Sequence, residues 1–182
     1  MMRKMFWLGA SLVLSANVAL GATGDKQNLQ LFNDVAKAVN RYAYFSIFDD
    51  VQADVKDGVV TLTGKVTMPY KRDEIEKRVA KVAGVQKVTD HITILPVSQF
   101  DDRLRYRIAR AIYSNPNFWN YGLGPNPSIH VIVDRGHVTL TGTVMNNTDR
   151  IIARSLVDQF GVMSVANELK TEAEVRDALE KL

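Results

Sequence analysis

The chain has 182 residues, of which 46% are hydrophobic and 24% charged, a composition that fits a globular protein and argues against a disordered one. It contains no cysteine, which excludes disulfides, a thiol nucleophile and a zinc–thiolate site. The formal net charge of +3 comes from 23 basic and 20 acidic residues, and without Arg3 and Lys4 it falls to +1 (21 minus 20), which gives no case for a nucleic-acid partner.

The first 22 residues have the pattern of a secretory signal peptide. Arg3 and Lys4 precede an apolar run from Met5 to Leu14, and small residues then continue to Ala22. A positive start, an apolar centre and a small-residue end are the parts of such a leader. We expect cleavage near Ala22 and a periplasmic protein. An uncleaved membrane anchor is the less favoured alternative, because polar residues interrupt a stretch barely long enough to span a bilayer.

The rest of the chain contains one sequence motif in two similar copies, GVVTLTGKV at residues 58–66 and GHVTLTGTV at residues 136–144. Each copy follows an alternating apolar strand and a turn, Asp57-Gly58 in the first and Arg135-Gly136 in the second. Asp-Gly favours a type I′ hairpin, since both central residues of that turn need positive φ. The predicted register places inward residues opposite each other: Val55 and Val60, Ala53 and Leu62, Val51 and Gly64, then Val133 and Val138, Val131 and Leu140, Ile129 and Gly142.

Three glycines in each copy are expected to have structural roles: Gly58, Gly64 and Gly84, then Gly136, Gly142 and Gly161. The first of each set completes the hairpin turn. The second lies on the inward face, where the missing side chain would let a helix backbone approach the sheet. The third is expected to end a helix, because glycine accepts the left-handed conformation.

Amphipathic helices flank each hairpin, with apolar residues at three- and four-residue steps: Leu31, Val35, Ala38 and Val39, then Ile75, Val79, Val82 and Ala83; and in the second copy Leu104, Ile108, Ala111 and Ile112, then Ile151, Ile152, Leu156 and Phe160. A last strand follows in each copy, beginning at Val85 and at Val162.

These elements predict an α+β fold of two tandem α-β-β-α-β modules, each a three-stranded sheet covered on one face by two helices. The modules are expected at residues 28–96 and 100–170. Modules of this size are marginal alone, so the pair is expected to pack together. Thr171 and Glu174 have the spacing of a capping box, which predicts a short C-terminal helix within residues 171–182.

The G-x-V-x-L-x-G-x-V motif, the helix after it and a G-V-x-x-V segment before the last strand recur in the same order. This arrangement resembles the tandem BON-domain proteins of the bacterial envelope, and an extended loop in the second module departs from the pattern. The resemblance implies a non-enzymatic periplasmic protein, associated with phospholipid or membrane-surface binding, envelope integrity and osmotic stress. The resemblance implies no catalytic residues. The residues that match the family pattern are expected to have structural roles: Gly58, Val60, Leu62, Gly64, Gly84, Val85 and Val88, with Gly136, Val138, Leu140, Gly142, Gly161, Val162 and Val165.

Two features are candidates for binding. One edge of the helix that opens the second module is basic, and a loop rich in Gly, Pro and Asn carries aromatic residues; the candidates are Arg103, Arg107, Arg110, Phe118, Trp119 and Tyr121. If both face outward, they form a peripheral site for an anionic phospholipid surface. The alternatives are a solvated helix face and a loop that folds back over the core. A protein-interaction or chaperone-like role, with envelope proteins as partners, is the rival function.

We expect neither an enzyme nor a metal or other cofactor. The three histidines, at positions 91, 130 and 137, are too few for a metal site. Asp49-Asp50 and Asp101-Asp102 precede a strand and a helix, where aspartate commonly serves as a turn or cap residue. No nucleophile, base and orienting group can be placed together.

Overall fold

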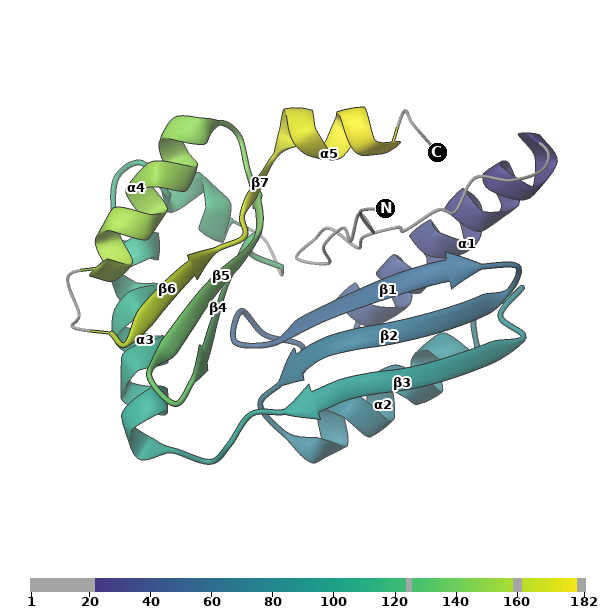
Figure 1. Ribbon diagram of the computed structural model, residues 1–182, viewed down its shortest axis with the longest axis horizontal. Coiled ribbons are helices and arrows are strands. Elements are labelled where there is room, and N and C mark those ends of the chain that lie inside the picture. Colours follow the sequence, from purple (N-terminus) through teal and green to yellow (C-terminus); the bar gives the residue numbers. More distant parts are fainter. Residues whose placement is uncertain (1–21, 124–125, 159–161, 180–182) are drawn as a thin grey trace.

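The computed structural model describes residues 22–123, 126–158 and 162–179, and it confirms an α+β fold with two similar halves (Figure 1). The predicted leader, apart from Ala22, and the predicted helix-ending Gly161 lie outside the described residues.

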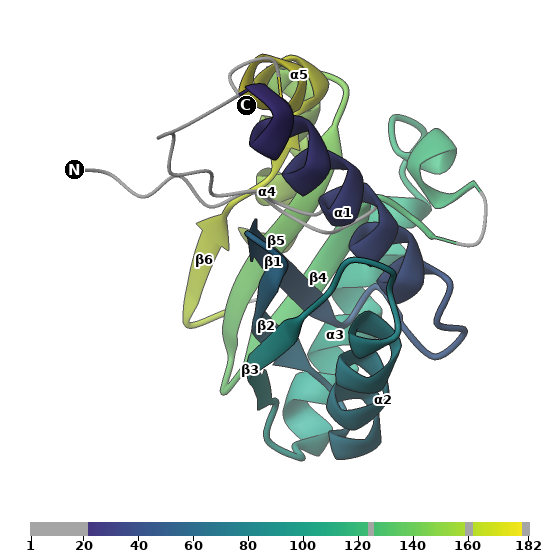
Figure 2. The same ribbon diagram turned by 90° about the vertical axis from the view of Figure 1, so that its right-hand side faces the viewer.

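In the first module, two helices cover one face of a three-stranded sheet (Figures 1 and 2). Its elements are α1 (Ala22–Asn40), β1 (Asp50–Lys56), β2 (Val59–Val66), α2 (Pro69–Ala80) and β3 (Lys87–Ile94). The sheet order is β1-β2-β3, with β1 antiparallel and β3 parallel to β2. The apolar faces of both helices and of the sheet form one buried core.

The second module repeats this order with one insertion and one split strand. Its elements are α3 (Gln99–Tyr113), the 3-10 helix η1 (Trp119–Gly122), β4 (Ile129–Asp134), β5 (His137–Val144), α4 (Asn147–Asp158), β6 (Ser164–Asn167), β7 (Lys170–Thr171) and α5 (Glu172–Leu179). β5 pairs antiparallel with β4 and parallel with both β6 and β7, so two short strands replace the single third strand that the sequence predicts. At the break between β6 and β7, the side-chain oxygen of Asn167 accepts the backbone N–H of Leu169, and the Leu169 side chain is buried in the core.

Both hairpins have the predicted register, with Val55 opposite Val60 in the first and Val133 opposite Val138 in the second. Asp57 and Gly58 have φ values of 50° and 78°, and Arg135 and Gly136 have 51° and 79°. These positive values are those of a type I′ turn.

The role predicted for Gly64 and Gly142 needs correction. A Cβ at Gly64 would lie 2.2 Å from the carbonyl oxygen of Asp50, and one at Gly142 would lie 2.0 Å from that of Ser128. Backbone at the start of the preceding hairpin strand, and not a helix, therefore excludes a side chain at both positions.

Gly84 also differs from its predicted role, because α2 ends at Ala80 with Lys81 as its C-cap. Gly84 has a φ of 93° in the turn that leads to β3. The predicted capping box is confirmed: Thr171 Oγ1 accepts the N–H of Glu174, and a Glu174 carboxylate oxygen accepts the N–H of Thr171.

The modules meet through the sheet faces that their own helices leave open. Asp50 on β1 accepts a hydrogen bond from Thr141 on β5, and Lys65 on β2 pairs with Asp134 on β4 at 2.6 Å. The edge of β4 is covered as well, since Val131 donates its N–H to the carbonyl oxygen of Ile47 at 2.7 Å. The predicted packing of two marginal modules against each other is therefore present, through these polar contacts and through Phe48, which packs against the core of the second module.

Candidate functional site

The three candidate arginines lie on the exposed side of α3, as the sequence predicts. At 100° per residue, Arg103, Arg107 and Arg110 fall within a narrow arc of the helix, and all three are exposed. The axial rise from the first to the last is about 10 Å. This face, with its three guanidinium groups, is called the arginine stripe below.

Buried polar contacts at the start of α3 fix the direction in which the stripe points. The carboxylate of Asp101 accepts the N–H groups of Arg135 and Gly136, both at 2.9 Å, and so holds the turn of the second hairpin. The guanidinium of Arg105 donates to the carbonyl oxygen of Val133 at 2.6 Å and pairs with Asp102. With Leu104 and Ile108 in the core, the helix cannot rotate without breaking these contacts.

The aromatic loop folds back over the core, which is one of the two courses that the sequence left open, so the candidates Phe118 and Tyr121 are not exposed for contact with lipid. Phe118 is fully buried, and Tyr121 is 7% exposed and packs on it with ring centroids 5.5 Å apart. Trp119 is 63% exposed and Leu123 is 62% exposed. Phe118 and Tyr121 are three residues apart and fall on the same, buried side of the η1 turn, because a 3-10 helix has three residues per turn.

The hydroxyl group of Tyr121 acts as a structural tie. It donates to the carboxylate of Asp149 at the start of α4 and accepts the N–H of Met145 at 2.9 Å. Burial, followed by the hydrogen bond to Asp149, raises the pKa of Tyr121 to about 12, so the hydroxyl keeps its proton at neutral pH. The loop is thus anchored at Tyr121, and the exposed Trp119 lies two residues before this anchor.

Tyr106 is an exposed aromatic residue on α3 that the sequence pattern did not single out. It is 67% exposed on α3, and its ring meets that of Phe48 at a centroid distance of 5.1 Å. The helical spacing could have indicated it, because at 100° per residue Tyr106 lies about 40° from Arg110, beside the arginine stripe.

Buried ionisable groups gather between the modules, away from the arginine stripe. Asp49 accepts hydrogen bonds from the Ser46 and Thr67 hydroxyls and pairs with Lys71 at 2.6 Å. His130 alternates along β4 with the core residues Ile129 and Val131, yet it is also buried. It packs against Phe45, and its Nδ1 lies 2.6 Å from the carbonyl oxygen of Asp49. Burial, the first cause, lowers the pKa of His130, which favours the neutral ring. These buried contacts stabilise the packing of the fold.

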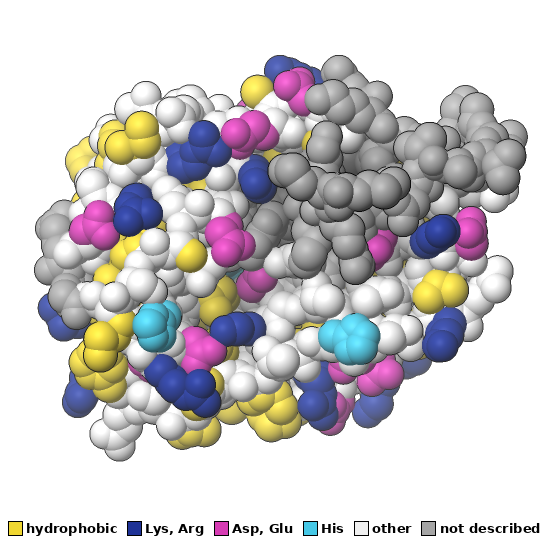
Figure 3. Space-filling model, in the orientation of Figure 1, with side chains coloured by type: hydrophobic (Ala, Val, Ile, Leu, Met, Phe, Trp, Pro, Cys, Tyr) yellow, Lys and Arg dark blue, Asp and Glu magenta, His cyan; other side chains and the backbone are white. Residues whose placement is uncertain are grey.

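Within residues 22–123, 126–158 and 162–179, no group of three or more His, Cys, Asp or Glu side chains is placed to hold a metal ion. In the same ranges, no helix combines the length and apolar character of a membrane span. Basic and acidic side chains are interspersed on the face seen in Figure 3 and form no large field of one sign there.

The BON domain matches the chain twice, at residues 31–96 and 101–180. The chain belongs to the BON-domain family. BON domains are non-catalytic binding domains that are associated with membranes and phospholipids, and proteins that contain them are associated with the bacterial envelope. The two matches agree with the duplication read from the sequence and with the two modules of the fold.

The chain also resembles two structures of CdsD, a structural protein of the type III secretion system of Chlamydia trachomatis. For its C-terminal domain, the identity is 16%, the TM-score 0.27, and the match covers 85% of this chain and 68% of that one. For the second CdsD structure, the identity is 15%, the TM-score 0.29, and the match covers 81% and 96% of the two chains. Similarity this distant assigns no function. No curated protein matches the chain in sequence.

Proposed function

We propose that this protein is exported to the periplasm and binds the surface of membranes that contain anionic phospholipid. The arginine stripe and the exposed Trp119 on the second module form the contact. The observation that carries the proposal is the fixed outward orientation of the three arginines, which Asp101 and Arg105 impose from the buried side. The leader pattern of residues 1–22 supports export. A part in osmotic or envelope stress, which the family resemblance implies, belongs to the same proposal.

The expected affinity follows from the groups available. Each arginine near an anionic surface contributes about 1 kcal/mol, so the stripe supplies about 3 kcal/mol. Partial insertion of Trp119 and Leu123 adds roughly 1.5–3 kcal/mol in total, since a fully buried large apolar side chain is worth about that much. Ordering costs reduce the sum, which leaves reversible binding weaker than about micromolar. The electrostatic part is screened as salt rises.

Vesicle sedimentation tests the proposal. The protein should sediment with phosphatidylglycerol vesicles and stay in solution with phosphatidylcholine vesicles. The triple variant Arg103→Gln, Arg107→Gln and Arg110→Gln should lose about tenfold or more in affinity, because it removes the stripe without touching the core.

A matched control removes three exposed charges from the first module, as Lys77→Gln, Lys81→Gln and Lys87→Gln. It should sediment like the unchanged protein. Equal loss in both triple variants would mean that net charge alone attracts the protein. Equal recovery with both kinds of vesicle would count against the stripe, and capture of a defined envelope protein without lipid would favour the protein-interaction alternative.

A further inference from the structure

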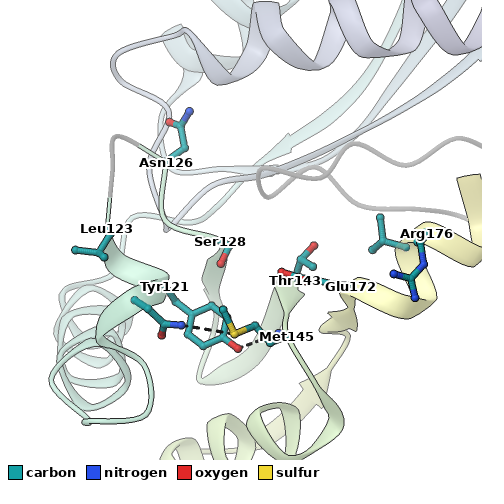
Figure 4. A pocket seen from close by; sticks show the side chains of 10 residues that line it. Tyr121, Leu123, Asn126, Ser128, Thr143, Met145, Glu172 and Arg176 are labelled. Atoms are coloured by element: carbon teal, nitrogen blue, oxygen red, sulfur yellow. Dashed lines mark hydrogen bonds between the residues drawn. The ribbon is translucent and has the colours of Figure 1, made fainter.

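A cavity of about 520 Å³ lies between η1, the end of β5 and α5 (Figure 4). Its walls are formed by Asn120, Tyr121, Leu123, Asn126, Ser128, Thr143, Met145, Glu172, Val175 and Arg176. This volume is in the range of sites that hold small molecules.

The side of the cavity nearest the loop has apolar side chains. Leu123 and Met145 are both exposed, at 62% and 54%, and both line it beside the ring of Tyr121. The hydroxyl of Tyr121 is held by Asp149 and by the N–H of Met145, which fixes its ring in this wall. Trp119, one residue before Asn120, places the cavity next to the proposed membrane contact.

The opposite side carries one charge of each sign. Glu172 and Arg176 lie four residues apart on α5 and therefore on one face of the helix. Neither forms an ion pair in the part of the chain that the structure describes, whereas Glu174 on the same helix pairs with Arg150 at 3.0 Å. The Thr171–Glu174 capping box fixes the first turn of α5, and Glu172 and Arg176 line the cavity opposite the loop (Figure 4).

We propose that this cavity binds one phospholipid headgroup that has a phosphate and a primary ammonium, that is, phosphoethanolamine. The Arg176 guanidinium matches a phosphate, and the Glu172 carboxylate accepts hydrogen bonds from an ammonium with N–H donors. A choline headgroup has no N–H, and a glycerol headgroup has no cation. The first carbons of the lipid rest on Leu123 and Met145 while the chains remain in the bilayer.

This assignment deepens the proposed function and rests on it, because the lipid reaches the cavity from a membrane that the second module contacts. The stripe would provide attraction to anionic membranes, and the cavity would select among headgroups. The two contributions come from different residues, so they can be separated by experiment.

Calorimetric titration of the full chain with dihexanoyl phospholipids, kept below the concentration at which they form micelles, tests the assignment without a bilayer. The ethanolamine lipid should bind at least tenfold more tightly than the choline or glycerol lipid. Glu172→Gln should remove that preference, and Arg176→Gln should weaken binding of all three lipids about tenfold or more. Glu76→Gln and Lys77→Gln, on the exposed face of α2, are matched charge controls and should change neither result.

Equal affinity for the three lipids, no binding of any of them, or an intact preference in the Glu172→Gln variant would overturn the assignment. Glu172 and Arg176 are exposed, so their variants should keep the melting temperature of the unchanged protein, and thermal unfolding checks this. The variant that lacks the arginine stripe should still prefer the ethanolamine lipid in this titration. That result separates failure of the cavity from failure of the proposed membrane surface.

Discussion

Asp49 and Asp50 are neighbours in the chain and both are buried, yet their environments differ. Asp49 has the ammonium of Lys71 at 2.6 Å and several donors. Asp50 has two neutral donors, Gln52 and Thr141, each at 3.3 Å. Burial, the first cause, raises the pKa of Asp50 to about 7, and the nearby Glu168 acts in the same direction. Lys65, opposite Asp50 on β2, is directed to Asp134 instead.

Asp50 therefore predicts a pH dependence of stability. Its pKa rises from 3.8 in the unfolded chain to about 7 in the folded one, so the folded state holds the proton more tightly. The contribution of this proton is complete below the unfolded value and is lost as pH rises through about 7. Denaturant unfolding should show Asp50→Asn losing up to about 3 kcal/mol less stability than the unchanged protein between pH 5 and pH 8.

His130 and Glu168 remain in both proteins, so the difference between them isolates Asp50. Parallel pH profiles for the two proteins would contradict this assignment. The sequence could not indicate this site, because a polar residue at an alternating strand position is ordinarily solvent-facing. The second module converts that face of β1 into an interface.

At the scale of elements, hairpin registers and turns were predictable from the sequence, because period-two patterning and Asp-Gly chemistry act locally. The path of the aromatic loop was not. Its composition allowed both an exposed and a buried course, and the choice depends on whether Phe118 and Tyr121 find space over the core. The roles of Gly64 and Gly142 depend on the approach of neighbouring backbone, which no local pattern reports.

Alanine substitution at the glycines separates steric exclusion from backbone strain. Gly84→Ala should cost about 1–3 kcal/mol of unfolding free energy, since its φ is 93° but the nearest atom to a new Cβ would be 3.5 Å away. Gly64→Ala should cost more, because its Cβ would meet the Asp50 carbonyl oxygen at 2.2 Å and the strands must move apart. Equal losses in chemical denaturation would show that strain alone makes these glycines necessary.

At the scale of the whole molecule, the two modules should unfold as one unit. Ile132 is 4% exposed although it lies on the face of β4 that its own helices leave open. Its neighbours on that face, His130 and Asp134, both contact the first module, which places Ile132 beneath it. Duplication was visible in the sequence, but the way in which the copies pack was not, since both interface faces are largely polar.

Ile132→Lys tests this coupling, because it puts an unpaired charge into the contact between the modules. Scanning calorimetry should resolve two transitions in this variant, with the first at a lower temperature than in the unchanged protein. The unchanged protein and Ile132→Val should each give one transition. A single unaltered transition for Ile132→Lys would mean that the modules do not stabilise each other.

The fluorescence of Trp119 tests the membrane proposal most directly. In a Trp7→Phe chain it is the one remaining tryptophan, and it is exposed on the loop that Tyr121 anchors. Phosphatidylglycerol vesicles should shift its emission to shorter wavelength, added salt should reverse the shift, and phosphatidylcholine vesicles should leave it unchanged. Sedimentation with phosphatidylglycerol vesicles without any shift, or the same shift with both lipids, would contradict binding through this surface.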